Sequence, residues 1–197
     1  IGGLNSVTLR ANSAYKHDGT PDSGVKITYS GSVSDSSAPY IVSYDSSTYG
    51  EYKVKIEDIE FADFNNSADV HVYGFLLSEK TTIMSRCLVN NFSSNGSSTK
   101  RFRVFRQGKP RIQNCMIFNC GKTWGTGGVS ANVQVFNLDN STAAKVYNST
   151  IYNIFDSSYN TVWGAFYGEY INTIIVDAGT CFRLVSGSSN SNNISSD

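Results

Sequence analysis

The chain has 197 residues, a formal net charge of zero and only 16% charged residues, against roughly 25% in typical soluble domains. This length predicts one domain, and a neutral chain without a basic run is not expected to bind nucleic acid. No apolar stretch is long enough to predict insertion into a membrane.

A short segment recurs along the chain, and its first residue is here called the anchor. The anchors are polar: Asp58, Arg86, Asn114, Asn148, Asn172 and Asn193, the last opening a truncated copy. They are separated by 28, 28, 34, 24 and 21 residues. Unequal periods of this size are typical of stacked supersecondary units that carry loops of variable length.

Side chains alternate with period two on both sides of each anchor, but the alternation slips by one at the anchor itself. Around Asn114, for example, the slip falls between Ile112 and Cys115. The pattern predicts a short strand, a corner at the anchor and a second strand. We therefore predict an all-β parallel β-helix of about six to seven coils, irregular or capping over residues 1–50 and regular over residues 51–197.

Stacked coils align equivalent residues in columns. We expect Asp58, Asn114, Asn148, Asn172 and Asn193 to form a hydrogen-bonded ladder. A second column, five residues after the anchor, consists only of Asn and Asp and predicts the next corner: Asp63, Asn91, Asn119, Asn153 and Asp177. Apolar columns lie between them, and we expect the Asn, Cys and Ile positions of the repeat to face the interior.

From about Ile56 to Asp197 this pattern resembles the right-handed parallel β-helix proteins of the pectate-lyase-like class. The stretch from His17 to Val25 also looks like a segment found in β-helix proteins of phage particles. The resemblance implies a right-handed solenoid and a structural or adhesive module on a virion surface, such as a tailspike, fibre or capsid appendage. Its expected partners are other virion subunits, commonly as a homotrimer, and a host surface polysaccharide.

The same class contains enzymes, so the alternative is a polysaccharide lyase or glycoside hydrolase acting on a cell-surface polysaccharide, secreted or at a bacterial surface. Hydrolysis needs two carboxylates roughly 5–9.5 Å apart. The outward candidates are Glu57 and Glu60 in one coil, and Glu169 and Asp177 near the other end. Because acidic residues are sparse, we expect surface charges rather than a catalytic pair, and we expect a non-enzymatic module.

Neither a metal nor a cofactor is expected. Lyases of this fold hold calcium with clustered Asp residues, and no such cluster occurs in the sequence. Four cysteines, Cys87, Cys115, Cys120 and Cys181, allow two disulfides, and Cys87 and Cys115 fall in one column of adjacent coils. We favour buried free thiols acting as small apolar side chains.

The insertions between the anchors are expected to project and to form the binding face. Aromatic residues in or beside them are the candidates for contact with a glycan or a neighbouring subunit: Trp124, Tyr159, Trp163 and Tyr167. The two ends of the sequence predict a piece of a longer protein.

Overall fold

The structure is a computed structural model that describes residues 6–30, 40–44, 53–66, 71–77, 82–95, 101–122, 132–138, 144–156, 162–183 and 189–196. Regular structure in these ranges consists of strands, so the all-β prediction is confirmed. In the part of the chain that is described, no helix has the length and apolar character needed to cross a membrane.

The strands form three parallel sheets. Sheet A contains β1 (Ser6–Arg10), β4 (Lys53–Glu57), β7 (Ile83–Ser85), β11 (Arg111–Gln113), β14 (Lys145–Tyr147), β17 (Glu169–Ile171) and β20 (Ser189–Ser191). Sheet B contains β2 (Lys26–Ser30), β5 (Glu60–Asn66), β8 (Leu88–Asn90), β9 (Ser93–Ser94), β12 (Met116–Lys122), β15 (Thr150–Asp156), β18 (Ile174–Ala178) and β21 (Ile194–Ser196). Sheet C contains β3 (Val42–Tyr44), β6 (Val72–Leu77), β10 (Arg101–Gly108), β13 (Asn132–Asn137), β16 (Val162–Phe166) and β19 (Thr180–Arg183).

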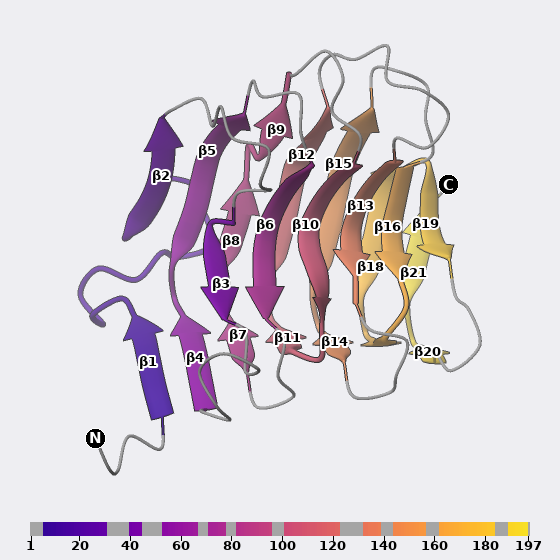
Figure 1. The fold of residues 1–197 in the computed structure, drawn as a ribbon. Coiled ribbons are helices and arrows are strands. Elements are labelled where there is room, and N and C mark those ends of the chain that lie inside the picture. Colours follow the sequence, from indigo (N-terminus) through magenta and orange to yellow (C-terminus); the bar gives the residue numbers. More distant parts are fainter. Residues whose placement is uncertain are drawn as a thin grey trace.

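The chain visits the three sheets in a fixed rotation from A to B to C, and one such passage is here called a round. β1, β2 and β3 make the first round, and each later strand pairs in parallel with its counterpart one round earlier. In Figure 1 the strands of sheets A and B point up, the strands of sheet C point down nearest the viewer, and successive rounds advance from left to right.

Each corner predicted at an anchor, from Asp58 to Asn172, lies between a strand of sheet A and the following strand of sheet B. The backbone there is left-handed, with φ of 53° at Asn114, 46° at Asn148 and 50° at Asn172. Asn and Asp tolerate this region better than other residues that carry a Cβ. The slip in alternation is therefore correctly explained by a corner.

The predicted anchor Asn193 is wrong by one residue. Asn192 has the left-handed φ of 52°, and the amide of Asn172 donates to the carbonyl of Ser191. Asn193 instead occupies the position after the anchor: it accepts a hydrogen bond from the Thr173 amide (2.6 Å) and donates to the Tyr170 carbonyl (2.9 Å). The truncated copy offered two adjacent Asn residues, and the sequence alone did not distinguish them.

The anchor side chains point outward, which corrects the expectation that they face the interior. Asn114, Asn148 and Asn172 are exposed, and Asn172 Nδ2 donates to Asn148 Oδ1 over 3.1 Å. At the first two anchors an ion pair takes the place of the amide hydrogen bond, because Arg86 donates to both carboxylate oxygens of Asp58. A left-handed residue turns its side chain to the outside of the corner, so the following residue points inward.

The residue that follows each anchor from Asp58 to Asn172 is buried on the inner side of the corner. Cys87, Cys115, Ser149 and Thr173 each donate to the carbonyl two residues earlier, at distances of 2.8–3.3 Å. These small polar groups satisfy carbonyls that would otherwise be buried without a partner. All four cysteines are buried and free, as favoured from the sequence.

The second Asn and Asp column forms the longer ladder. All five residues have left-handed φ values of 52–59°. Because Asp63, Asn119, Asn153 and Asp177 lie inside strands of sheet B, the predicted second corner is a bend within this sheet. Asn91 Nδ2 donates to Asp63 (3.1 Å), Asn119 Nδ2 to Asn91 (3.4 Å) and Asn153 Nδ2 to Asn119 (2.6 Å). Lys26 continues the row with an ion pair to Asp63 (2.6 Å). Side-chain hydrogen bonds thus join five consecutive rounds.

Between the sheets lies one apolar core. Phe61, Val89, Ile117, Ile151 and Ile175 pair in register along sheet B, and none of them has exposed surface. Opposite them, the rings of Phe75, Phe105 and Phe136 stack at centroid distances of 4.9 and 5.1 Å. The predicted apolar columns are correct, and this packing holds the three sheets at fixed positions.

Candidate functional site

The aromatic residues chosen from the sequence do not gather in one place. Trp124 and Tyr159 lie outside the described residues. Trp163 lies on the outer face of sheet C, next to Gln134 on β13, and is only 9% exposed. Tyr167 occupies the turn from β16 to β17 with φ of 61°, and its carbonyl accepts a hydrogen bond from the Tyr170 hydroxyl. Neither described residue forms an open aromatic platform.

The acidic candidates Glu169 and Asp177 lie on different sheets with a corner between them. Glu169 starts β17 in sheet A and forms an ion pair with Lys145 (3.0 Å). Asp177 belongs to β18 in sheet B, at the second corner, and is exposed. The two carboxylates therefore do not face a common space, and this geometry does not form a pair for general acid and base chemistry.

Glu60 precedes the core residue Phe61 on β5 and so points away from the core, as expected, but it is covered rather than exposed. Its side chain has no exposed surface, because the N-terminal loop of residues 11–25 covers it. Its two oxygens accept hydrogen bonds from Asn90 Nδ2 (2.7 Å) and from the Asp22 amide (2.7 Å). Glu60 thus fastens the loop to sheet B, while Glu57 contacts Arg10 and Arg86 at 3.9 Å.

The N-terminal loop creates a polar groove among the described residues. The groove has a volume of about 620 Å³. Residues 16–19 of the loop line one side, and the anchors Asp58, Arg86, Asn114 and Asn148 line the other. Met116 and Thr150 of sheet B also line it. A second hollow of about 650 Å³ shares Lys16, Asp58 and Arg86 and reaches residues 10–13.

Charges in this groove are fixed by local hydrogen bonds. Arg86 donates to both oxygens of Asp58, at 2.7 and 3.0 Å, and these bonds lower the pKa of Asp58. Hydrogen bonds from Thr20 lower the pKa of Asp18 to about 2, so this side chain is a carboxylate at neutral pH. His17 Nε2 lies 2.5 Å from the Arg86 carbonyl and ties the loop to the corner.

The groove therefore presents amides, a hydroxyl and charges of both signs. Such groups can hydrogen-bond to sugar hydroxyls or to the polar surface of another protein chain. Among the described residues, no three His, Cys, Asp or Glu side chains are placed to hold a metal ion. The site is suited to binding.

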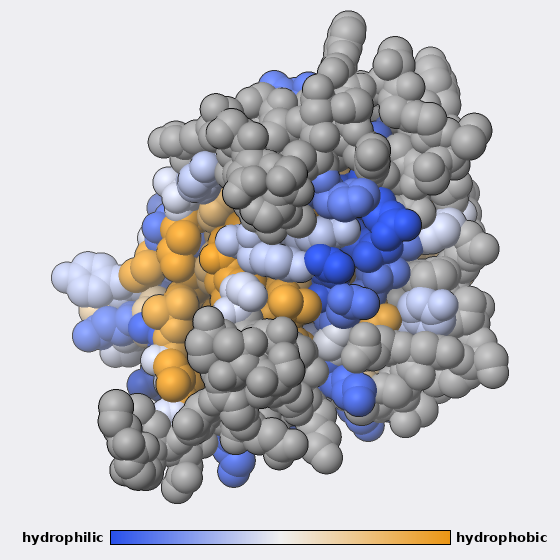
Figure 2. Space-filling model, in the orientation of Figure 1, coloured by the Kyte–Doolittle hydropathy of each residue, from blue (hydrophilic) through white to orange (hydrophobic). Residues whose placement is uncertain are grey.

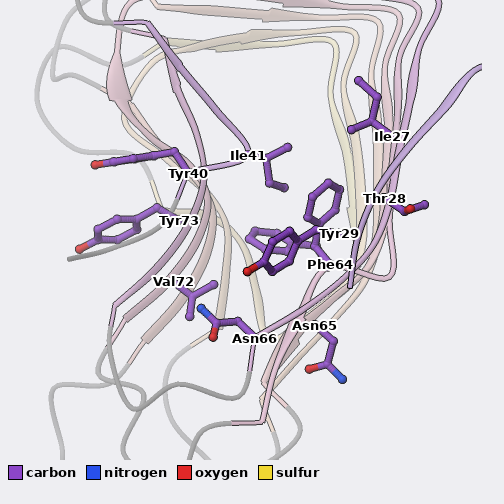
Figure 3. Close-up of a pocket in the computed structure, with 11 residues that line it drawn as sticks. Ile27, Thr28, Tyr29, Tyr40, Ile41, Phe64, Asn65, Asn66, Val72 and Tyr73 are labelled. Carbon is purple, nitrogen blue, oxygen red and sulfur yellow. The ribbon is translucent and has the colours of Figure 1, made fainter. Parts of the chain in front are cut away.

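A smaller apolar cavity of about 270 Å³ opens at the first round, between sheets B and C. Figure 3 shows Tyr29, Phe64, Ile41 and Val72 converging on this space, whereas Tyr40 and Tyr73 point away from it. The cavity belongs to the start of the core, because no earlier round among the described residues packs against it.

The chain matches no protein-family model, no curated protein and no solved structure in the comparisons made. The groove must therefore be interpreted from its own residues. Sequence reasoning missed it because its walls come from residues that are far apart: His17 and Arg86 are 69 positions apart. Only the Asn anchors could have indicated that an exposed polar edge exists.

Proposed function

We propose that the three sheets form a right-handed parallel β-helix of about seven coils. The rotation from A to B to C supports this, as does the parallel pairing of each strand with its counterpart one round earlier. The course of the chain in Figure 1, up through sheets A and B and down through sheet C as the rounds advance, supports a right-handed coil. Crossover connections between parallel strands are right-handed in about 98% of cases.

We further propose that the chain is a structural or adhesive module at the surface of a virion, in the manner of a tailspike, fibre or capsid appendage. The observation that carries the proposal is that the polar side chains of the described residues hold the fold together or border an open groove. The ladders join successive rounds, the carboxylates at Glu60 and Glu169 hold other parts of the chain, and the amides of the first ladder border an open groove.

In this proposal the groove beside the N-terminal loop contacts a host surface glycan or a neighbouring subunit, with a homo-oligomer as the assembled form. Thr150→Trp would fill the groove from sheet B without removing a charge or an anchor. Thr8→Trp provides a matched control, because Thr8 is exposed on β1 and lies outside the groove.

Two measurements test the proposal: binding to an array of bacterial surface polysaccharides, and the oligomeric state by analytical ultracentrifugation. Loss of either glycan binding or assembly in Thr150→Trp, with Thr8→Trp unchanged, is the expected result. Equal behaviour of both variants would refute the groove as the contact site. An antibody against the chain that fails to label purified phage particles of the source culture would refute the virion location.

The enzymatic alternative has its own signature. Depolymerisation of a surface polysaccharide that is abolished by Glu169→Gln or Asp177→Asn would replace the adhesive proposal with a lyase or hydrolase.

A further inference from the structure

Sheet C differs from the other two sheets in the charges on its strands. Among the strand residues whose side chains are described, sheet C contains Arg101, Arg103 and Arg106 and no Asp or Glu, whereas sheets A and B both include acidic residues. Figure 2 views the molecule from the side of sheet C and shows hydrophilic side chains gathered over β10 and β13, beside a hydrophobic patch over β3 and β6. This face therefore carries positive charge that its own strands do not neutralise.

Arg106 is held in a fixed position on this face by aromatic residues. Its guanidinium carbon lies 4.3 Å from the centre of the Tyr73 ring, and its Nη1 donates to the Tyr40 hydroxyl. The Tyr40 and Tyr73 rings stack on each other at 5.7 Å. The Nε of Arg106 is buried and has no acceptor among the described residues. A buried donor without an acceptor is costly and is often satisfied by a bound group.

Arg103 lies on the same strand and is the direct neighbour of Tyr73 across the sheet. Its Nε donates to Gln134 Oε1 over 2.7 Å, and its guanidinium carbon lies 5.8 Å from the Tyr73 ring centre. Burial, with the nearby positive charges of Arg101 and Arg106, lowers the pKa of Arg103. Neither Arg103 nor Arg106 forms an ion pair with any described carboxylate.

Both guanidiniums are thus positioned by neutral partners while their charges remain uncompensated within the described structure. Each guanidinium has five N–H donors in a planar fork, and a single neutral acceptor occupies only one of them. Planar forks of this kind bind carboxylate, sulfate and phosphate groups through paired hydrogen bonds. Fixing the side chains in advance reduces the entropy lost on binding.

We propose that Arg103 and Arg106, on the outer face of sheet C, form a binding site for an oxyanion. The ligand is a carboxylate, sulfate or phosphate group, either as a free ion or as part of an acidic sugar. The site lies on a different sheet from the polar groove, so it does not depend on the function proposed for that groove.

The test is isothermal titration of the full chain with sodium sulfate, sodium phosphate, sodium glucuronate and glucose, at constant ionic strength set with sodium chloride. Arg106→Gln removes the charge and the fork, and Arg106→Lys keeps the charge alone. Arg111→Gln is the matched control, because Arg111 also lies over a tyrosine ring, that of Tyr147 at 5.9 Å, but on sheet A. Arg103→Gln is the second variant at the site, and circular dichroism first establishes that each variant is folded.

We expect Arg106→Gln and Arg103→Gln to weaken anion binding at least about tenfold, Arg106→Lys to weaken it less, and Arg111→Gln to leave it unchanged. Sulfate or phosphate binding without glucuronate binding assigns a free ion, whereas tighter glucuronate binding assigns an acidic sugar. The proposal is overturned if no anion binds, if glucose binds as well as glucuronate, or if Arg111→Gln weakens binding as much as Arg106→Gln.

Discussion

Asn119 is the central residue of the second ladder and tests what that ladder contributes. It donates to Asn91 over 3.4 Å and accepts from Asn153 over 2.6 Å, and its backbone φ is 53°. Two effects therefore coincide at one residue, the side-chain bonds between rounds and the tolerance of a left-handed backbone. Substitution by Ala removes both, whereas substitution by Gly removes only the bonds.

The expected losses follow from these two effects. The two hydrogen bonds contribute about 0.5–1.5 kcal/mol each, so Asn119→Gly is expected to lower the free energy of unfolding by roughly 1–3 kcal/mol. Gly also adds about 0.5–1 kcal/mol of lost chain entropy relative to Ala. Ala in the left-handed region costs about 1–2 kcal/mol. Because this strain exceeds the entropy term, Asn119→Ala is expected to be less stable than Asn119→Gly by about 0.5–1 kcal/mol.

Urea unfolding followed by circular dichroism measures both variants against the unsubstituted chain, with the m-value as the check that the transition is unchanged. A stability of Asn119→Gly equal to that of the unsubstituted chain would show that the ladder bonds contribute nothing. A stability of Asn119→Ala equal to or above that of Asn119→Gly would show that backbone strain does not select Asn at this corner.

Three further predictions concern charge, space and thiol burial. Hydrogen bonds from Arg86 lower the pKa of Asp58 below its usual 3.8. The stability that these bonds contribute is therefore present above pH 3.8 and is lost as the pH falls from 3.8 through the lowered pKa. In Asp58→Asn the urea midpoint should depend less on pH between about pH 5 and about pH 2. Gly121→Ala would place a Cβ 1.9 Å from a backbone carbonyl oxygen of the next strand and should lower the free energy of unfolding by at least about 2 kcal/mol. In Gly179→Ala the new Cβ lies 3.4 Å from its nearest atom, so the free energy of unfolding should change by no more than about 0.5 kcal/mol. Differential scanning calorimetry compares the two variants, and equal melting temperatures would contradict this account of the packing. Burial raises the pKa of Cys120 to about 12, so a thiol reagent should leave it unmodified until urea unfolds the chain, and fast labelling of the native protein would show that this part of the core is open.

The sequence was sufficient for the features that repeat at every round. The slip at Asn114 predicted the corner, and the Asx column through Asn119 predicted the second one, because both positions need a left-handed backbone that few residue types accept. The direction of the anchor side chains was predicted wrongly. A left-handed residue breaks the simple alternation of faces, so counting positions along the strand could not establish that Asn148 points outward.

Features built between rounds could not be predicted in this way. The polar groove depends on the loop carrying His17 folding against a corner 69 residues away, and the sequence gives no period that relates them. The pairing of Arg103 with Tyr73 and Gln134 requires the register of three strands in sheet C, where no anchor residue marks the alignment. Trp163 belongs to the same row, and no pattern around it indicated that it would be nearly buried.

The second ladder also has a consequence for how such a chain can change. Its bonded neighbours are 28, 28 and 34 residues apart in sequence, yet each pair forms a similar hydrogen bond. The spacing of the rounds is therefore independent of how much chain lies between them. Rounds separated by 28 and by 34 residues keep the same ladder, so extra chain can be accommodated between two rounds without shifting the register of their neighbours.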